Sequence, residues 1–114
     1  MCKLIGRFFF KLTDSKNLIG EFSNNFSKRN FTESADRTIP NAADGKFDGE
    51  YYSTWHDDEK EHISVLAKLN ITRKNENIFS LKWEIVNETG KFWGEGMVCD
   101  GILIGDYRNF DPIV

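Results

Sequence analysis

The chain has little of what marks a disulfide-rich, membrane-spanning or nucleic-acid-binding protein. Its 114 residues include only two cysteines, Cys2 and Cys99, which are too few for a disulfide framework, and we expect both thiols to be reduced. No apolar run approaches the roughly 20 residues that a membrane-spanning helix needs, so we expect no membrane partner. The formal net charge of −3 indicates no basic face, so no nucleic acid partner is expected.

Long helical periodicity is also missing, and we expect no secretory leader. Residues 1–8 place charged side chains within and beside a short apolar stretch, which is typical of a strand and not of a signal peptide. We therefore expect a cytoplasmic protein. No residue spacing matches a known zinc or calcium pattern, and we expect no cofactor.

What the chain does have is alternation with a period of two residues, which predicts half-buried strands. In residues 62–72, Ile63, Val65, Leu69 and other apolar side chains take one face while polar side chains take the other. The predicted strands are 2–12, 18–23, 46–56, 62–72, 78–86, 91–99 and 102–108.

A five-residue phrase recurs five times: a bulky apolar residue, any residue, Gly, a charged residue and usually an aromatic residue. The copies begin at Leu4, Leu18, Phe47, Phe92 and Leu103, and only the copy at Phe92 lacks the final aromatic. Because positions one, three and five of a strand share a face, the phrase places apolar groups and a glycine inward and a charge outward. Glycine within a strand favours bending or close approach, so the phrase predicts a strongly curved sheet.

Turn sequences predict how the strands pair. Asp100-Gly101 lies between two apolar runs and predicts a two-residue type I′ hairpin that places Met97 opposite Ile104. A second hairpin is predicted around Asn75-Glu76, which would place Leu69 opposite Leu81. A turn near Glu88 would place Trp83 near Gly94 and Leu81 near Gly96.

These patterns predict an all-β fold, in which residues 1–114 form one domain. We expect an antiparallel meander of seven or eight strands that closes into a small up-and-down barrel, because closure hides the apolar face and removes the edges. Residues 24–45 would be a long crossing segment, with a strand or short helical turn around Phe31 to Ile39. An open, strongly curled sheet is the alternative.

The strand phrases at Leu103 to Tyr107 and Phe47 to Tyr51 resemble those of the calycin superfamily, which comprises the lipocalin- and avidin-type barrels. The resemblance extends over most of the chain in its strand rhythm. It implies a calycin-like β-barrel and ligand binding inside it. The chain lacks the Gly-x-Trp opening of lipocalins and the biotin-site residues of avidins, so the resemblance assigns no site residue.

The predicted interior is aromatic and carries no charge. Its members are Leu4, Phe8, Phe10, Phe22, Phe47, Tyr51, Ser53, Trp55, Val65, Leu69, Phe79, Leu81, Trp83, Phe92, Val98, Leu103 and Tyr107. Acid–base catalysis needs a positioned ionisable group, so no active site is expected there. The side chains that could orient a small apolar or aromatic ligand are Tyr51, Ser53, Trp55, Trp83 and Tyr107. The alternative is that these side chains fill the core completely.

Two other places could carry function. His56, Asp57 and His62 flank a charged turn, where they could bind a divalent metal or support an enzyme site at the barrel mouth, although a solvated turn is the simpler interpretation. On the outer face of the last hairpin, Trp93, Met97, Ile102 and Ile104 form an apolar group typical of a protein interface. The hypotheses are therefore a ligand-binding barrel, an interaction module such as an inhibitor, an immunity-type partner or a subunit, and an enzyme. The partner expected at the last hairpin is a second copy of the chain, in a homodimer.

Overall fold

The computed structural model describes residues 4–39, 47–57 and 63–109, and these residues form eight β-strands. In chain order the strands are β1 (Ile5–Leu12), β2 (Leu18–Asn24), β3 (Phe31–Arg37), β4 (Gly49–Asp57), β5 (Ile63–Arg73), β6 (Ile78–Ile85), β7 (Lys91–Cys99) and β8 (Ile102–Asn109). No helix among the described residues has the length and apolar character needed to cross a membrane.

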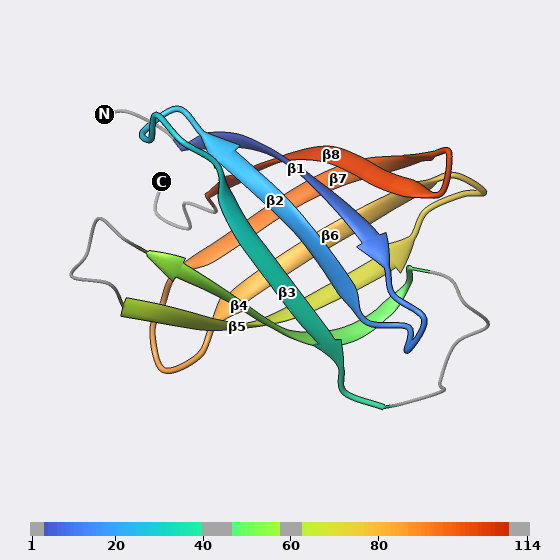
Figure 1. Ribbon diagram of the computed structural model, residues 1–114, viewed down its shortest axis with the longest axis horizontal. Helices are drawn as coiled ribbons and strands as arrows, with labels where there is room; N and C mark the ends of the chain where they lie inside the picture. The colour runs from blue at the N-terminus through green and yellow to red at the C-terminus, as the bar shows by residue number, and fades with distance from the viewer. Residues whose placement is uncertain (1–3, 40–46, 58–62, 110–114) are drawn as a thin grey trace.

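The strands form a closed antiparallel barrel (Figure 1). Each strand pairs with the next along the chain, and β8 returns to pair with β1, where Phe8 lies opposite Gly105. The predicted all-β meander and its closure are confirmed. Closure matters for the site because it encloses the apolar face of every strand in one interior.

The repeated phrase does line that interior. Leu18, Tyr51 and Leu103 are almost fully buried, and the charged position of each phrase lies on the other side of the strand. Gly6 shows why glycine occupies the middle position. A Cβ atom there would overlap the ring of Tyr107 and the carbonyl oxygen of Ser23. The missing side chain therefore lets an aromatic ring lie directly on the backbone of the neighbouring strand.

The hairpin between β7 and β8 has the predicted register. Asp100 and Gly101 both have positive φ angles, 52° and 77°, as a type I′ turn requires. Met97 lies opposite Ile104, and Cys99 lies opposite Ile102.

The predicted registers of the two preceding hairpins are wrong by two residues. Leu69 lies opposite Trp83, and Leu81 lies opposite Gly94. The β5–β6 connection is longer than a two-residue turn, because the Lys74 and Asn75 amides both donate to the Ile78 carbonyl. A shift of two residues leaves every side chain on its predicted face, whereas a shift of one residue would have reversed them all.

Part of the segment 24–45 forms β3, and this strand corrects the prediction of an uncharged interior. Its inward side chains are Phe31, Glu33, Ala35 and Arg37, and the last three are buried. Its outer face is polar throughout, whereas its inner face mixes apolar Phe31 and Ala35 with the ionisable Glu33 and Arg37, and the inner face was therefore not assigned from the sequence. Residues 40–46 lie outside the described part of the chain.

The two ends of the barrel interior differ. At the end that contains the β1–β2 and β7–β8 turns, the core is filled by side chains such as Phe10, Leu18, Tyr51 and Leu103. Arg37 is buried here. Its guanidinium lies 4.7 Å from the centre of the Tyr51 ring and donates to the carbonyl oxygens of Lys16 and Asp48. The opposite end is hollow.

A cavity with a buried carboxyl group at the open end of the barrel

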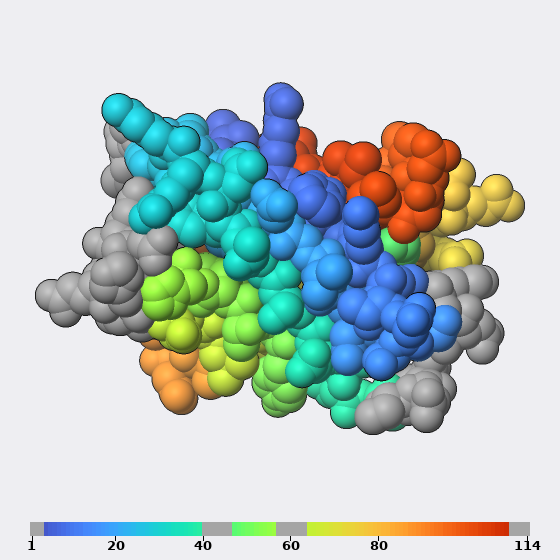
Figure 2. All heavy atoms as spheres, viewed as in Figure 1, coloured from blue at the N-terminus to red at the C-terminus, as the bar shows by residue number. Residues whose placement is uncertain are grey.

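The hollow end contains a cavity of about 440 Å³. It opens where β2, β4, β6 and β8 end and where β1, β3, β5 and β7 begin, which is the left end of the barrel in Figure 1. Side chains of β1, β2 and β3 cover the wall of the barrel that faces the viewer in Figure 2. The residues that line the cavity are Leu4, Phe8, Phe22, Asn24, Phe26, Ser27, Phe31, Glu33, Trp55, Val65, Trp83, Ile85, Glu88, Phe92 and Tyr107.

Aromatic rings from seven of the eight strands surround this space, and β5 is the strand that contributes none. Phe22 is central to the arrangement, because its ring stacks on Phe31 at 5.1 Å and meets Trp55 edge-on at 5.8 Å and Tyr107 edge-on at 6.0 Å. Phe92 contacts Tyr107 edge-on at 6.0 Å. Because these rings hold one another in edge-on and offset contacts, the aromatic walls are preformed.

Glu33 projects into this aromatic space from β3. Its side chain is only 5% exposed. The Ser53 hydroxyl donates to Oε2 of Glu33, and the indole N–H of Trp83 donates to the same oxygen over 2.9 Å. The carboxyl group is thus held by hydrogen bonds from β4 and β6, which fix its position at the boundary between the hollow and filled halves.

Burial changes the acidity of this group. Loss of solvent raises the pKa of Glu33 from 4.5 to about 7, although the hydrogen bonds from Ser53 and Trp83 lower it in part. Burial likewise raises the pKa of Tyr107 to about 12, against a lowering by the hydrogen bond that Asn24 donates to its hydroxyl. Near neutral pH the cavity therefore holds a neutral phenol and a carboxyl group close to its midpoint of ionisation.

The predicted ligand-orienting residues separate into two groups. Trp55, Trp83 and Tyr107 line the cavity, and Ser53 reaches it through its hydrogen bond to Glu33. Tyr51 lies in the filled half, where its hydroxyl donates to the Phe47 carbonyl oxygen over 2.6 Å. Both alternatives weighed from the sequence, a filled core and a hollow one, thus occur in different halves of the same barrel.

Sequence reasoning missed Glu33. The signal that could have found it is parity within β3, because Phe31 and Ala35 are apolar and Glu33 lies between them on the same face.

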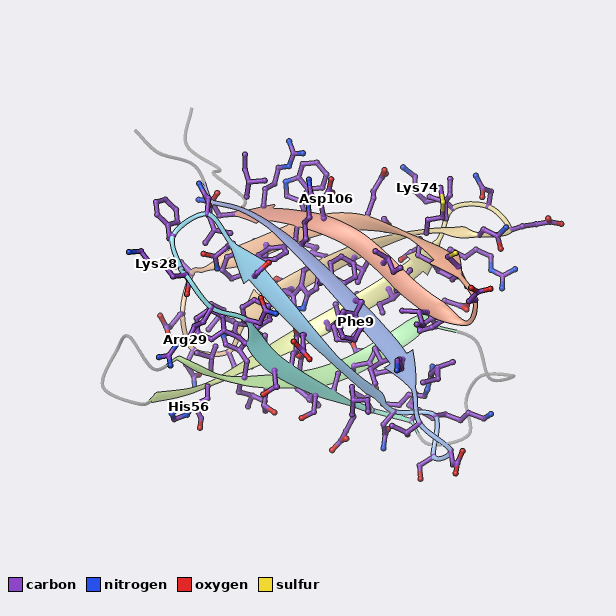
Figure 3. The ribbon with its side chains drawn as sticks, turned by 45° about the horizontal axis from the view of Figure 1, so that its top comes forward. Phe9, Lys28, Arg29, His56, Lys74 and Asp106 are labelled. Atoms are coloured by element: carbon purple, nitrogen blue, oxygen red, sulfur yellow. The ribbon has the colours of Figure 1, made fainter. Side chains whose placement is uncertain are left out.

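The predicted metal and enzyme site is only partly described. His56 is exposed on the outer face of β4 and does not line the cavity (Figure 3). Asp57 ends β4, and His62 lies outside the described residues. Within residues 4–39, 47–57 and 63–109, no three His, Cys, Asp or Glu side chains are grouped as a metal site requires. A site built from His56, Asp57 and His62 stays a prediction.

The predicted interface residues lie on the outer face of the last hairpin. Trp93, Met97 and Ile104 are 40%, 56% and 50% exposed, and Ile102 is partly buried. The guanidinium of Arg108 lies 4.8 Å from the centre of the Trp93 ring and shields part of it. The register places Phe9, Ile104, Met97 and Ile78 side by side in one row across four neighbouring strands.

No protein-family model, curated protein or solved structure matches this chain.

Proposed function

We propose that this protein binds a small apolar or aromatic molecule non-covalently in the open end of its barrel. The observation that carries the proposal is the cavity of about 440 Å³ walled by aromatic rings. Ligand pockets in proteins commonly measure about 300–1,000 Å³ and combine apolar walls with a few placed polar groups. Glu33, Asn24 and Tyr107 supply such groups here.

The division of the interior supports the same function. A barrel of eight strands has room for side chains or for one small ligand. In one half of this barrel, Tyr51, Phe10 and Leu103 are fully buried and fill the interior. The hollow half is therefore not explained by a general lack of large side chains in the sequence. At the mouth, Phe26 is 53% exposed although it lines the cavity, which leaves an apolar surface at the point of entry.

We include in this proposal that the barrel is of the calycin type. The eight-strand up-and-down meander and the phrases at Phe47 to Tyr51 and Leu103 to Tyr107 support this assignment. Such barrels are suited to binding a ligand at an open end, because the wall is rigid and side chains do not fill that end.

The test is binding of the neutral probe N-phenyl-1-naphthylamine, followed by its fluorescence in titrations against the wild-type protein. Val65→Trp places an indole in the cavity, and Leu66→Trp places one on the outer face of the same strand. We expect saturable binding by the wild type and Leu66→Trp, and affinity at least about tenfold weaker in Val65→Trp because the space is filled. Equal affinities in the two variants would contradict a cavity site.

A second proposed function is self-association through the outer face of the last hairpin. The row of Phe9, Ile104, Met97 and Ile78 supports it, because a contiguous apolar strip on the outside of a sheet is typical of an interface. A homodimer would bury this strip against its copy.

Sedimentation velocity over a range of protein concentrations tests this second function. Met97→Asp should lower the sedimentation coefficient of an associated wild type, because a carboxylate would be buried in the interface. Thr54→Asp adds the same charge on the outer face of β4 and should leave association unchanged. A wild type that sediments as a monomer at every concentration would contradict self-association.

A further inference from the structure

The charged side chains that line the cavity, among the described residues, are all acidic. Among the described residues that line it, Glu33 and Glu88 are acidic, and none is Lys, Arg or His. Lys28 and Arg29 are exposed on the β2–β3 connection and do not line the cavity (Figure 3). This described part of the lining therefore offers an anionic ligand no positive partner, and it offers a cationic ligand a carboxylate.

The aromatic walls favour the same sign of ligand. The faces of Trp, Phe and Tyr rings carry negative electrostatic potential and attract a cation within about 6 Å, more strongly where water is excluded. Trp55, Phe22, Phe92 and Tyr107 bound the space that Glu33 faces. A carboxylate at the base of such walls is a recognition site for an ammonium group with an apolar body.

Both hydrogen bonds to Glu33 observed among the described residues reach Oε2, from Ser53 and Trp83. A ligand ammonium group that approaches from the cavity could therefore take Oε1 as its partner without displacing either donor. These donors also hold the carboxyl group in one position, so binding would require little further ordering of the side chain.

We propose that the ligand of this cavity is an organic cation, a small primary amine with an aromatic or apolar body, whose ammonium group pairs with Glu33. The inference rests on the ligand-binding function proposed above and names its chemical class. The apolar body would lie among the rings of Phe22, Trp55 and Phe92, and the ammonium group would lie at the inner end of the cavity.

The raised pKa of Glu33 is consistent with an amine ligand. Burial raises the pKa of Glu33 to about 7, and a bound ammonium group would favour the ionised carboxylate, so amine binding below pH 7 should release a proton. Among the described residues that line the cavity, the other titratable groups are Tyr107 from β8 and Glu88 from the β6–β7 turn. Tyr107, whose pKa is raised to about 12, stays neutral over this range.

The experiment compares three probes with the same body and different head groups. They are 4-phenylbutylamine, 4-phenylbutan-1-ol and 4-phenylbutyrate, titrated into the full chain by isothermal calorimetry at pH 7.5. We expect the amine to bind at least about tenfold more tightly than the alcohol, and the carboxylate to bind most weakly, because a buried charge needs an opposite partner.

Two variants test whether Glu33 is the group that pairs with the amine. Glu33→Gln keeps an oxygen that can accept from Ser53 and Trp83 but removes the charge, so amine affinity should fall at least about tenfold while alcohol affinity stays within about twofold. Glu76→Gln removes a carboxylate from the exposed β5–β6 turn and should change neither affinity. Circular dichroism checks that each variant is folded.

Proton release provides a measurement that needs no variant. Titration of the wild type at pH 6 in buffers of different ionisation enthalpy should show net proton release on binding the amine and none on binding the alcohol. Failure of all three probes to bind would overturn the ligand-binding function and this inference with it. Alcohol or carboxylate binding at least as tight as that of the amine, or an amine affinity unaffected by Glu33→Gln, would overturn the amine class alone.

Discussion

At the scale of a single residue, Glu33 makes the stability of the folded protein depend on pH. Its carboxyl group is buried between β4 and β6 partners, and burial raises its pKa from 4.5 to about 7. The folded protein therefore binds this proton more tightly than the unfolded chain does. The stabilising effect is fully present below about pH 4.5 and is lost as the pH rises through 7.

The expected consequence is a change in the free energy of unfolding of roughly 3 kcal/mol between pH 4.5 and pH 7.5, with the protein less stable at the higher pH through this group. Glu33→Gln removes the titrating group. As the pH rises from 4.5 to 7.5, the free energy of unfolding of the variant should thus increase by this amount relative to that of the wild type. Urea unfolding of both proteins at several pH values measures it.

Glu76→Gln on the exposed turn between β5 and β6 is the matched control, and its difference from the wild type should not change with pH in this way. A Glu33→Gln difference that is constant from pH 4.5 to 7.5 would contradict a proton held by burial at Glu33. Comparison of differences removes the contributions of the other carboxyl groups, which both proteins share.

The strand β3 is the element that brings ionisable side chains into the interior of the barrel. Three of its inward side chains are buried, and two of them, Glu33 and Arg37, are ionisable. They serve opposite ends of the barrel: Glu33 faces the cavity, and Arg37 joins the filled end by donating to the carbonyl oxygens of Lys16 and Asp48. Gly49 allows this, since a Cβ atom there would meet the Arg37 guanidinium at 2.5 Å.

Substitution of Arg37 tests the structural role of β3 at its second end. Arg37→Met removes donors to two backbone carbonyls and the contact with the Tyr51 ring, and we expect a loss of about 2–4 kcal/mol in the free energy of unfolding. Arg73→Met is the comparison, because Arg73 also lies over a ring, that of Phe79, but is exposed. Chemical denaturation measures both, and equal losses would show that the buried hydrogen bonds of Arg37 contribute nothing.

Prediction from the sequence succeeded where an element carries a strong local signal. The turn Asp100-Gly101 determines its own register, because both residues adopt the positive φ angles that a type I′ turn needs. The β5–β6 connection has no such signal: its length depends on amides of Lys74 and Asn75 sharing the Ile78 carbonyl, which the sequence does not indicate. Of the two alternatives predicted around Phe31 to Ile39, a strand or a short helical turn, the strand was found as β3, but its inward face was not predicted.

Closure is a property of the whole molecule. The β1–β8 seam pairs Ile5 through Lys11 with Arg108 through Ile102, so neither terminal strand presents an unpaired edge. Closure also allows side chains to fill one end of the interior while the other end stays hollow. The hydrogen bonds between strands run all the way round the barrel, so the wall keeps its shape at the hollow end as well.

Hydrogen exchange measured residue by residue tests this closure. The hydrogen-bonded amides of the β1–β8 seam should exchange at rates within about tenfold of those in the β4–β5 ladder, because both belong to the same cooperative wall. Amides in the β2–β3 connection, which is exposed at Lys28 and Arg29, should exchange much faster and serve as the internal reference. Seam amides that exchange as fast as this connection would indicate an open sheet.

The sequence by itself determined the all-β fold class of this protein and the inner and outer faces of most strands. Local rules are sufficient for that, since period-two alternation and the Leu/Phe-x-Gly phrase assign faces without reference to partners. Only the tertiary structure decided where the interior is filled and where it is hollow, and that Glu33 lies inside with Ser53 and Trp83 as its donors. The physical reason is that cavity volume and carboxyl desolvation depend on how strands distant in the sequence close around one space.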